Sequence, residues 1–394
     1  MYKRILNNET YRVGDKIVNI KITKNQLIRF FIVFLLILFK YIEVWSYLFT
    51  KEFFKSKVIV GIIATLLLIV FRDVKIKTGN LNKIAILGVL CLAITLISHS
   101  IDYLVFFALV IIYFQIENGE KEFVYHYIVS TAILFALTIF LSLVGILPSF
   151  SIDRVVNGET ITRFNLGFLG ANTLFMFFYP IVISFLYLKY NVTKTRKICY
   201  GFVILIISWI FYKYTNCRTG MLCVCFAVLL YWQKIIFNTK LIRFVLRYYF
   251  LIFLMISILC ALKFNAYNNY LNILSSGRFN FWYFYIKNIK YTIIGMQPIQ
   301  GIPLDNIYLN NFYIYGLISY IITLIFSIMP YKNKKISNEF YFITLAFGIY
   351  GFFENNIVYV YNFLMFFQFY YFINCGKVWK EDEWRICQRY YTSI

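Results

Sequence analysis

Long apolar segments, separated by short charged clusters, follow one another along almost the whole chain of 394 residues. A helix that crosses a membrane needs about 20 apolar residues, so the 61% of apolar residues here would supply roughly twelve such helices. Charged residues make up 14% of the chain, too few to cover a soluble protein of this size. This composition excludes a soluble enzyme, a disordered chain and a secreted disulfide-rich domain. The sequence therefore predicts an all-α, polytopic integral membrane protein with a single transmembrane domain over residues 1–394.

The apolar segments also predict where the spanning helices lie. In the first half of the chain they are expected near residues 27–49, 56–71, 84–97, 103–116, 124–147 and 171–188. In the second half they are expected near residues 198–214, 219–233, 248–263, 312–329, 340–353 and 356–374. An even number of spans would bring both ends of the chain to the same side of the membrane.

The chain is strongly basic, with 39 lysines and arginines against 17 acidic residues and a formal net charge of +22. In a soluble protein this excess would suggest a nucleic-acid partner, but here the cations concentrate in one set of alternate loops. That set includes the tails 1–26 and 375–394, which are therefore expected in the cytosol, beside anionic membrane lipid. The two longest loops, 148–170 and 264–311, belong to the opposite set and are expected outside the cytoplasm. No nucleic-acid partner is expected.

The second long outer loop has a helical pattern of its own. Four of its apolar residues recur at helical spacing: Trp282, Tyr285, Ile289 and Ile293. This predicts a helix from Arg278 to Ile293 that lies in the membrane interface, with Trp282 facing the membrane or a lipid tail. Three glycines would let the loop move as a lid: Gly277, Gly295 and Gly301.

Three arginines are expected near the outer membrane surface, namely Arg163, Arg218 and Arg278. An ionisable side chain at membrane depth costs roughly 2.5–3.5 kcal/mol, so one that occurs there usually has a partner or a function. Each arginine stands beside glycine or small polar residues, which allow a ligand to approach the backbone closely. A shared site for an anion is one interpretation. The alternative is that each arginine reaches a lipid headgroup on its own.

Two carboxylates accompany these arginines, Asp305 in the second long loop and Glu354 after the eleventh expected span. A solvated loop carboxylate is the simpler interpretation of Asp305. The eight cysteines mostly lie in apolar segments, and the two histidines are too few for a histidine-based metal centre. Neither a metal nor another cofactor is expected.

Four short motifs occur in an order that resembles a known family. They are Arg163 to Asn172, Cys217 to Gly220, Ser276 to Arg278 with Trp282, and Asp305 to Leu309. With the expected twelve-span layout, they resemble the O-antigen and capsular polysaccharide polymerases of the Wzy type and the related O-antigen ligases. Two positions depart from the pattern. Ala171 stands where the family often has proline, and Asp305 stands where the ligases usually have histidine, which argues against a ligase that depends on that histidine.

The resemblance implies a metal-independent membrane glycosyltransferase of the C type in the bacterial cytoplasmic membrane. It would join undecaprenyl-pyrophosphate-linked oligosaccharide repeat units on the outer face of that membrane, with a flippase and a chain-length regulator as partners. Arg218 and Arg278 would hold the pyrophosphate across one cavity, with Arg163 at its rim. Asp305 would be the general base, with Glu354 as the alternative.

The same resemblance gives further expected substrate contacts, which are Asn172, Asn306, Tyr308 and Trp282. Two other functions stay open at this point. One is a ligase-like glycan transferase, and the other is a flippase or transporter of lipid-linked oligosaccharide.

Overall fold

The computed structural model describes the chain in segments. They are residues 10–13, 16–19, 23–45, 78–98, 102–114, 116, 119–156, 159–233, 237, 239–266, 270–275, 277–296, 299, 302–332, 336–354 and 363–374. These segments are mostly helical, which confirms the coarse prediction of a helical protein. The expected span 56–71, Gly301 and the tail 375–394 lie outside the described residues.

The helices follow the apolar segments closely. In the first half they are α1 Lys24–Val44, α4 Thr78–Ser98, α5 Asp102–Tyr113, α6 Gly119–Leu143 and α7 Ala171–Leu188. The middle of the chain forms α8 Lys194–Thr215, α9 Arg218–Trp232, α10 Lys240–Arg247, α11 Tyr249–Phe264, α12 Tyr270–Leu274 and α13 Arg278–Asn288. The last part forms α14 Ile307–Tyr313, α15 Gly316–Ile328, the short 3₁₀ helix η2 Met329–Lys332, α16 Asn338–Phe353 and α17 Leu364–Asn374. Every expected span that falls on described residues overlaps one of these helices.

Four of the described helices are long and apolar enough to cross a membrane by themselves. They lie in α1, α6, α7 and α8. The pair α10 and α11 passes the same test jointly but is bent by 79° between its two parts, so up to five spans meet the criterion. These helices are compatible with an all-α membrane protein, and the count of twelve spans stays a prediction.

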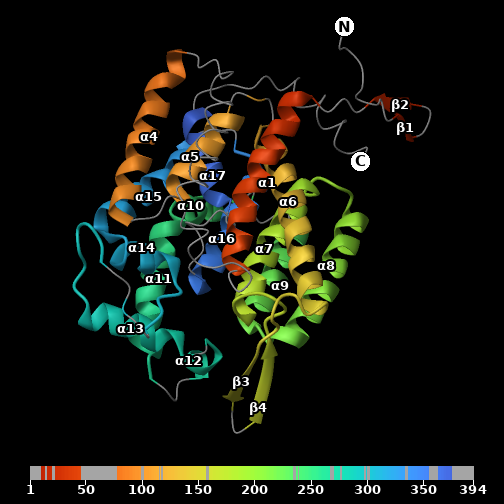
Figure 1. Ribbon diagram of the computed structural model, residues 1–394. Helices are drawn as coiled ribbons and strands as arrows, with labels where there is room; N and C mark the ends of the chain where they lie inside the picture. Colours follow the sequence, from red (N-terminus) through yellow and green to blue (C-terminus); the bar gives the residue numbers. More distant parts are fainter. Residues whose placement is uncertain are drawn as a thin grey trace.

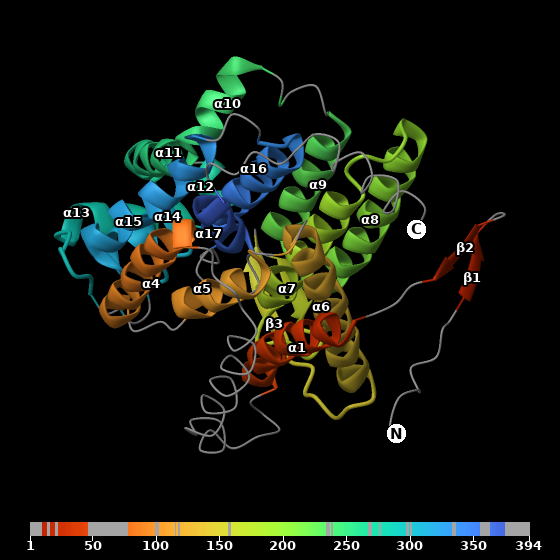
Figure 2. The same cartoon turned by 90° about the horizontal axis from the view of Figure 1, so that it is seen from above.

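The helices form two groups with α16 between them (Figures 1 and 2). One group contains α1 and α6 to α9, and the other contains α4, α5, α11 and α13 to α15. Between them α16 contacts α7 and α9 on one side and α11 and α14 on the other, while α17 contacts α4 and α5. Residues at the two ends of α16 can therefore reach both groups.

The first long loop contains a β-hairpin that the all-α prediction missed. Strand β3 Ser151–Val156 pairs antiparallel with β4 Glu159–Phe164, and Ile152 lies opposite Arg163. A second short hairpin, β1 Thr10–Val13 with β2 Lys16–Asn19, lies in the N-terminal segment. The β3–β4 hairpin lies at the same end of the molecule as α12 and α13 (Figure 1). The two loops expected outside the cytoplasm are thus found at one end of the helix bundle.

Helix α13 is shorter than expected, since it ends at Asn288 rather than at Ile293. The chain that follows bonds to the α14–α15 connection instead of continuing the helix. The Met296 amide donates to the Ile314 carbonyl at 2.8 Å, and the Leu317 amide donates to the Thr292 carbonyl at 3.0 Å. These backbone bonds tie the loop to the start of α15.

Two glycines make this close approach possible. Gly295 and Gly316 have φ of +99° and +85°, a left-handed conformation that other residues adopt at a cost. A Cβ atom on Gly316 would lie 2.3 Å from the amide nitrogen of Gly295. The prediction that Gly295 frees the loop to move is therefore corrected, because Gly295 is held against another backbone.

We expect Gly316→Ala to destabilise the protein more than Gly145→Ala. Both glycines are left-handed, which costs about 1–2 kcal/mol in any other residue. A Cβ on Gly145 would meet nothing within 4 Å, whereas one on Gly316 would push Gly295 away. The displaced backbone bonds are worth about 1 kcal/mol each. Thermal unfolding of the two variants in detergent measures the difference, and equal losses would show that the contact does not anchor the loop.

Candidate active site

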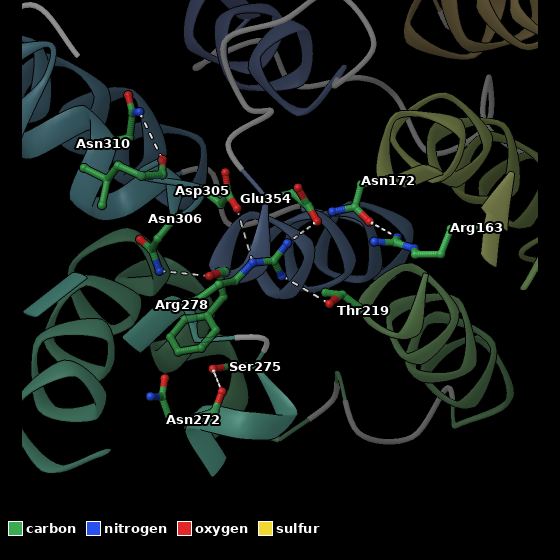
Figure 3. A network of polar contacts seen from close by, with 12 residues as sticks. Arg163, Asn172, Thr219, Asn272, Ser275, Arg278, Asp305, Asn306, Asn310 and Glu354 are labelled. Atoms are coloured by element: carbon green, nitrogen blue, oxygen red, sulfur yellow. Dashed lines mark hydrogen bonds and ion pairs between the residues drawn. The ribbon is translucent and has the colours of Figure 1, made fainter. Parts of the chain in front are cut away.

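Arg278 stands at the centre of a buried polar network at the end of the bundle that carries the long loops (Figure 3). Its Nη2 donates to Glu354 Oε1 at 2.8 Å, its Nη1 donates to Thr219 Oγ1 at 3.1 Å, and its Nε donates to Asp305 Oδ2 at 3.3 Å. The Arg278 and Glu354 side chains are each 7% exposed, and the Asp305 side chain is 37% exposed. One guanidinium therefore holds two carboxylates, one buried and one reached by solvent.

Each member of the network is placed by a helix end. Arg278 is the first residue of α13 and follows Gly277, whose φ is +81°. Glu354 ends α16, and its amide donates to the Tyr350 carbonyl at 2.9 Å. Thr219 lies in the first turn of α9, and Asp305 directly precedes the N-cap of α14. Helix ends hold side chains more firmly than open loops do, which favours a preorganised site.

Burial and neighbouring charges shift the pKa values of Glu354 and Arg278. Desolvation raises the pKa of Glu354 to about 7, and the nearby charge of Asp305 acts in the same direction, while Arg278 and Arg163 oppose it. Burial alone would lower the pKa of Arg278, but the attraction of Glu354 and Asp305 outweighs it and raises that pKa. Glu354 can thus exchange a proton near neutral pH while Arg278 stays charged.

Arg163 is a second arginine beside this network (Figure 3). It lies on β4, and its Nε donates to the Thr215 carbonyl at 2.8 Å, at the end of α8. Its Nη2 donates to Asn172 Oδ1 at 2.7 Å, at the start of α7. The positive charge of Arg163 lowers the pKa of Glu354, so the two side chains influence each other. The hairpin that the sequence analysis missed is the element that positions this arginine.

Arg218 differs from the other two arginines. Its guanidinium is half-buried and forms no side-chain hydrogen bond or ion pair within the described segments. The residue of its motif that contacts Arg278 is the neighbouring Thr219. A direct pairing of Arg218 with the Arg278 network is therefore not part of this structure, and Arg218 keeps its donors available.

Two of the expected substrate contacts have internal partners. The Asn306 side chain is fully buried, and its Nδ2 donates to Ser257 Oγ at 2.8 Å and to the Phe352 carbonyl at 2.9 Å. Its Oδ1 accepts from the Leu309 amide and caps α14. Tyr308 is also fully buried and donates to the Gly348 carbonyl at 2.6 Å. The polar atoms of both side chains thus have partners inside the protein, and Asn306 caps the helix that Asp305 directly precedes.

The prediction that Trp282 faces the membrane is wrong, because its side chain is fully buried in the protein. Its ring lies edge-on to Phe352 at 5.2 Å and to Phe279 at 5.1 Å between ring centroids. The reason is that α13 packs against α11, and Trp282 meets the end of α16. Its indole Nε1 has no hydrogen-bond partner among the residues that the structure describes.

The network can bind an anion and move a proton. Arg278 and Arg163 supply fixed positive charge, Arg218 supplies unused donors, and Glu354 can accept a proton at neutral pH. Thr219 was missed as a site residue, although it stands inside a motif that the sequence analysis singled out. Among the described residues, no group of three or more His, Cys, Asp or Glu side chains is arranged to hold a metal ion.

Comparison with known proteins identified no relative of this chain. No protein-family model matches the chain, and no curated protein or solved structure gives a significant match. A functional assignment therefore depends on the residues and geometry of the chain itself.

Proposed function

We propose that this chain is a membrane glycosyltransferase that polymerises oligosaccharide repeat units linked to undecaprenyl pyrophosphate. The observation that carries the proposal is the buried Arg278, which holds Glu354 and Asp305 at the end of an apolar helix bundle. The order of the Arg163, Arg218, Arg278 and Asp305 motifs, which resembles that of the Wzy-type polymerases, supports the same class of reaction.

The proposed reaction transfers the growing glycan to a new repeat unit. A hydroxyl oxygen of the acceptor sugar attacks the anomeric carbon of the donor sugar. The bond between that carbon and the pyrophosphate oxygen breaks, and undecaprenyl pyrophosphate leaves with the electron pair. The proton of the hydroxyl goes to a carboxylate. The donor is already activated, so the protein must position both sugars, stabilise the leaving charge and accept one proton.

We assign the proton-accepting role to Glu354 rather than to Asp305. A general base is most effective when its pKa lies near the working pH, and burial raises the pKa of Glu354 to about 7. Asp305, the more exposed carboxylate, contributes negative charge that raises this pKa. Asp305 is therefore proposed as a positioning residue that also faces the incoming acceptor.

We assign the pyrophosphate contact chiefly to Arg218. All the nitrogen atoms of the Arg278 guanidinium have partners, and Arg163 donates to Thr215 and Asn172. Arg218 is the one of the three whose guanidinium forms no side-chain hydrogen bond or ion pair with a described residue. A guanidinium can bond two phosphate oxygens at once, which suits a pyrophosphate leaving group.

Reconstitution tests the proposal. The purified full chain in proteoliposomes is supplied with undecaprenyl-pyrophosphate-linked repeat units, and the glycan products are separated by size. We expect a ladder of polymers together with free undecaprenyl pyrophosphate. Single repeat units moved to an unrelated acceptor would indicate a ligase, and movement of the lipid across the bilayer without bond cleavage would indicate a flippase. Either of these results would overturn the polymerase proposal.

Arg218 variants test the proposed leaving-group contact. Charge-assisted hydrogen bonds are worth about 1.5–3 kcal/mol each, so the loss of one in Arg218→Ala should lower the rate by about tenfold to about 150-fold. Arg218→Lys should recover little of this, because an ammonium cannot form the two parallel bonds of a guanidinium. The matched control is Arg196→Ala, an exposed arginine at the far end of α8, which should leave the rate unchanged. A normal rate for Arg218→Ala would remove Arg218 from the site.

A further inference from the structure

Helix α10 has a surface that the proposed function does not use. It is bent by 79° from α11, so α10 lies nearly in the membrane plane if α11 crosses the bilayer. Figure 2 shows α10 at the edge of the molecule, outside α11 and α16. It packs on the protein through Leu246, which is fully buried. Ile242, Val245 and Arg247 are half-buried, whereas Lys240, Leu241, Arg243 and Phe244 are exposed.

Two different stripes run along α10. Leu241 and Phe244 are 72% and 59% exposed, one helical turn apart, which is unusual for large apolar side chains. Beside them lies a basic stripe at positions i, i+3 and i+7, formed by Lys240, Arg243 and Arg247. Residues with this spacing share one face of a helix. An apolar face flanked by cations is typical of helices that lie in a membrane interface.

The two arginines of the basic stripe have guanidinium N–H groups without a hydrogen-bond partner among the described residues. The Nε of Arg247 is buried and has no hydrogen-bond partner in the described part of the chain, and its guanidinium lies over the Tyr248 ring at 5.5 Å. The Nε of Arg243 donates to the Phe237 carbonyl at 2.9 Å, and its guanidinium lies over the Tyr341 ring at 5.5 Å, while the residue as a whole is exposed. The α10 sequence contains no acidic residue that would neutralise these charges.

From this arrangement we infer that α10 is a docking surface for anionic phospholipid, with Leu241 and Phe244 inserted among the acyl chains and the basic stripe bound to headgroup phosphates. Charge complementarity identifies the occupant, because a zwitterionic lipid would satisfy the apolar stripe but not the three cations. Each cation near an anionic membrane surface strengthens the attraction about fivefold. The lipid would hold α10 against the membrane and fix the bend between α10 and α11.

Fluorescence quenching tests this inference in the full chain. Phe244→Trp is reconstituted into nanodiscs of equal parts phosphatidylglycerol and phosphatidylcholine, in which only one of the two lipids is brominated, and the quenching of the parent chain is subtracted. The control is Phe140→Trp on α6, because Phe140 is 58% exposed and matches Phe244 most closely among the phenylalanines that the structure describes. We expect the Phe244→Trp signal to be quenched more by the anionic lipid, and the control to be quenched equally by both.

Charge removal then assigns the preference to the basic stripe. Adding Lys240→Gln and Arg247→Gln to Phe244→Trp should remove most of the excess quenching by the anionic lipid, because the lipid preference falls about fivefold for each cation removed. The same charge change at the exposed Lys194 and Arg196 of α8 should leave the excess intact. Three results would overturn the inference: no quenching of Phe244→Trp, equal quenching by both lipids, or loss of the excess when inorganic phosphate is added at constant ionic strength. The last result would assign the stripe to a soluble anion.

Discussion

Arg278→Gln is expected to destabilise the protein more than any other single change in the network. Removing one partner of a buried ion pair costs about 3–5 kcal/mol, because the remaining charge stays buried without compensation. Here the remaining charge is Glu354, whose side chain is 7% exposed, while the more exposed Asp305 adds little. The apparent melting temperature in detergent measures the loss.

The loss should depend on pH in a defined direction. Without Arg278 the pKa of Glu354 rises further above the ordinary value of 4.5, since Arg278 is the main group that lowers it. A raised carboxyl pKa means that the folded state binds the proton more tightly than the unfolded state does. Relative to the wild type, whose Glu354 pKa is about 7, this added penalty is therefore absent at acidic pH, grows as the pH rises from about 7 towards the raised pKa, and is constant above it.

The double variant Arg278→Gln with Glu354→Gln provides the matched control. It leaves no uncompensated buried charge, so it should regain much of the stability that Arg278→Gln loses, although neither variant should be active. Non-additive effects of this kind are the signature of two groups in contact. If the double variant is as unstable as Arg278→Gln, the two side chains do not form the buried pair described here.

Glu354→Gln is expected to cause the largest loss of activity among the variants that keep the Arg278–Asp305 ion pair. General base catalysis contributes about 10²–10⁴-fold to a rate, and glutamine cannot accept the proton. Glu339→Gln is the matched control, because Glu339 lies at the other end of α16 and is 5% exposed, against 6% for Glu354. It should keep near-normal activity. Asp305→Asn should lower the rate less than Glu354→Gln, and full activity in Glu354→Gln would move the base elsewhere.

The helices could be predicted from the sequence because membrane-spanning segments are marked by local composition. The expected span 171–188 coincides with α7 Ala171–Leu188, whose apolar residues lie between polar flanks. The β3–β4 hairpin was missed although the sequence carries a signal for it. Its two six-residue strands are separated in the sequence by Asn157-Gly158, a dipeptide that favours two-residue hairpin turns.

For the candidate site, too, some features could be predicted from the sequence and others could not. Arg278, Asp305 and Glu354 could each be picked out, because charged side chains are rare in so apolar a chain. Their pairing could not, since Arg278 and Glu354 are 76 residues apart and meet only when α13 packs at the end of α16. Trp282 was placed on the wrong side because α13 carries aromatic residues all round, as its sequence RFNFWYFYIKN makes plain. Periodicity then does not show which face is buried.

The most direct test of the account is the pH dependence of undecaprenyl pyrophosphate release by the reconstituted chain. If Glu354 must be deprotonated to act, kcat/KM for the lipid-linked repeat unit rises about tenfold per pH unit at acidic pH. It then levels off above the Glu354 pKa of about 7. The residual activity of Glu354→Gln should show no such rise, while Glu339→Gln should keep the wild-type profile. A wild-type rate that does not change between pH 5 and 8, or an unchanged profile in Glu354→Gln, would contradict the assignment of Glu354 as the proton acceptor.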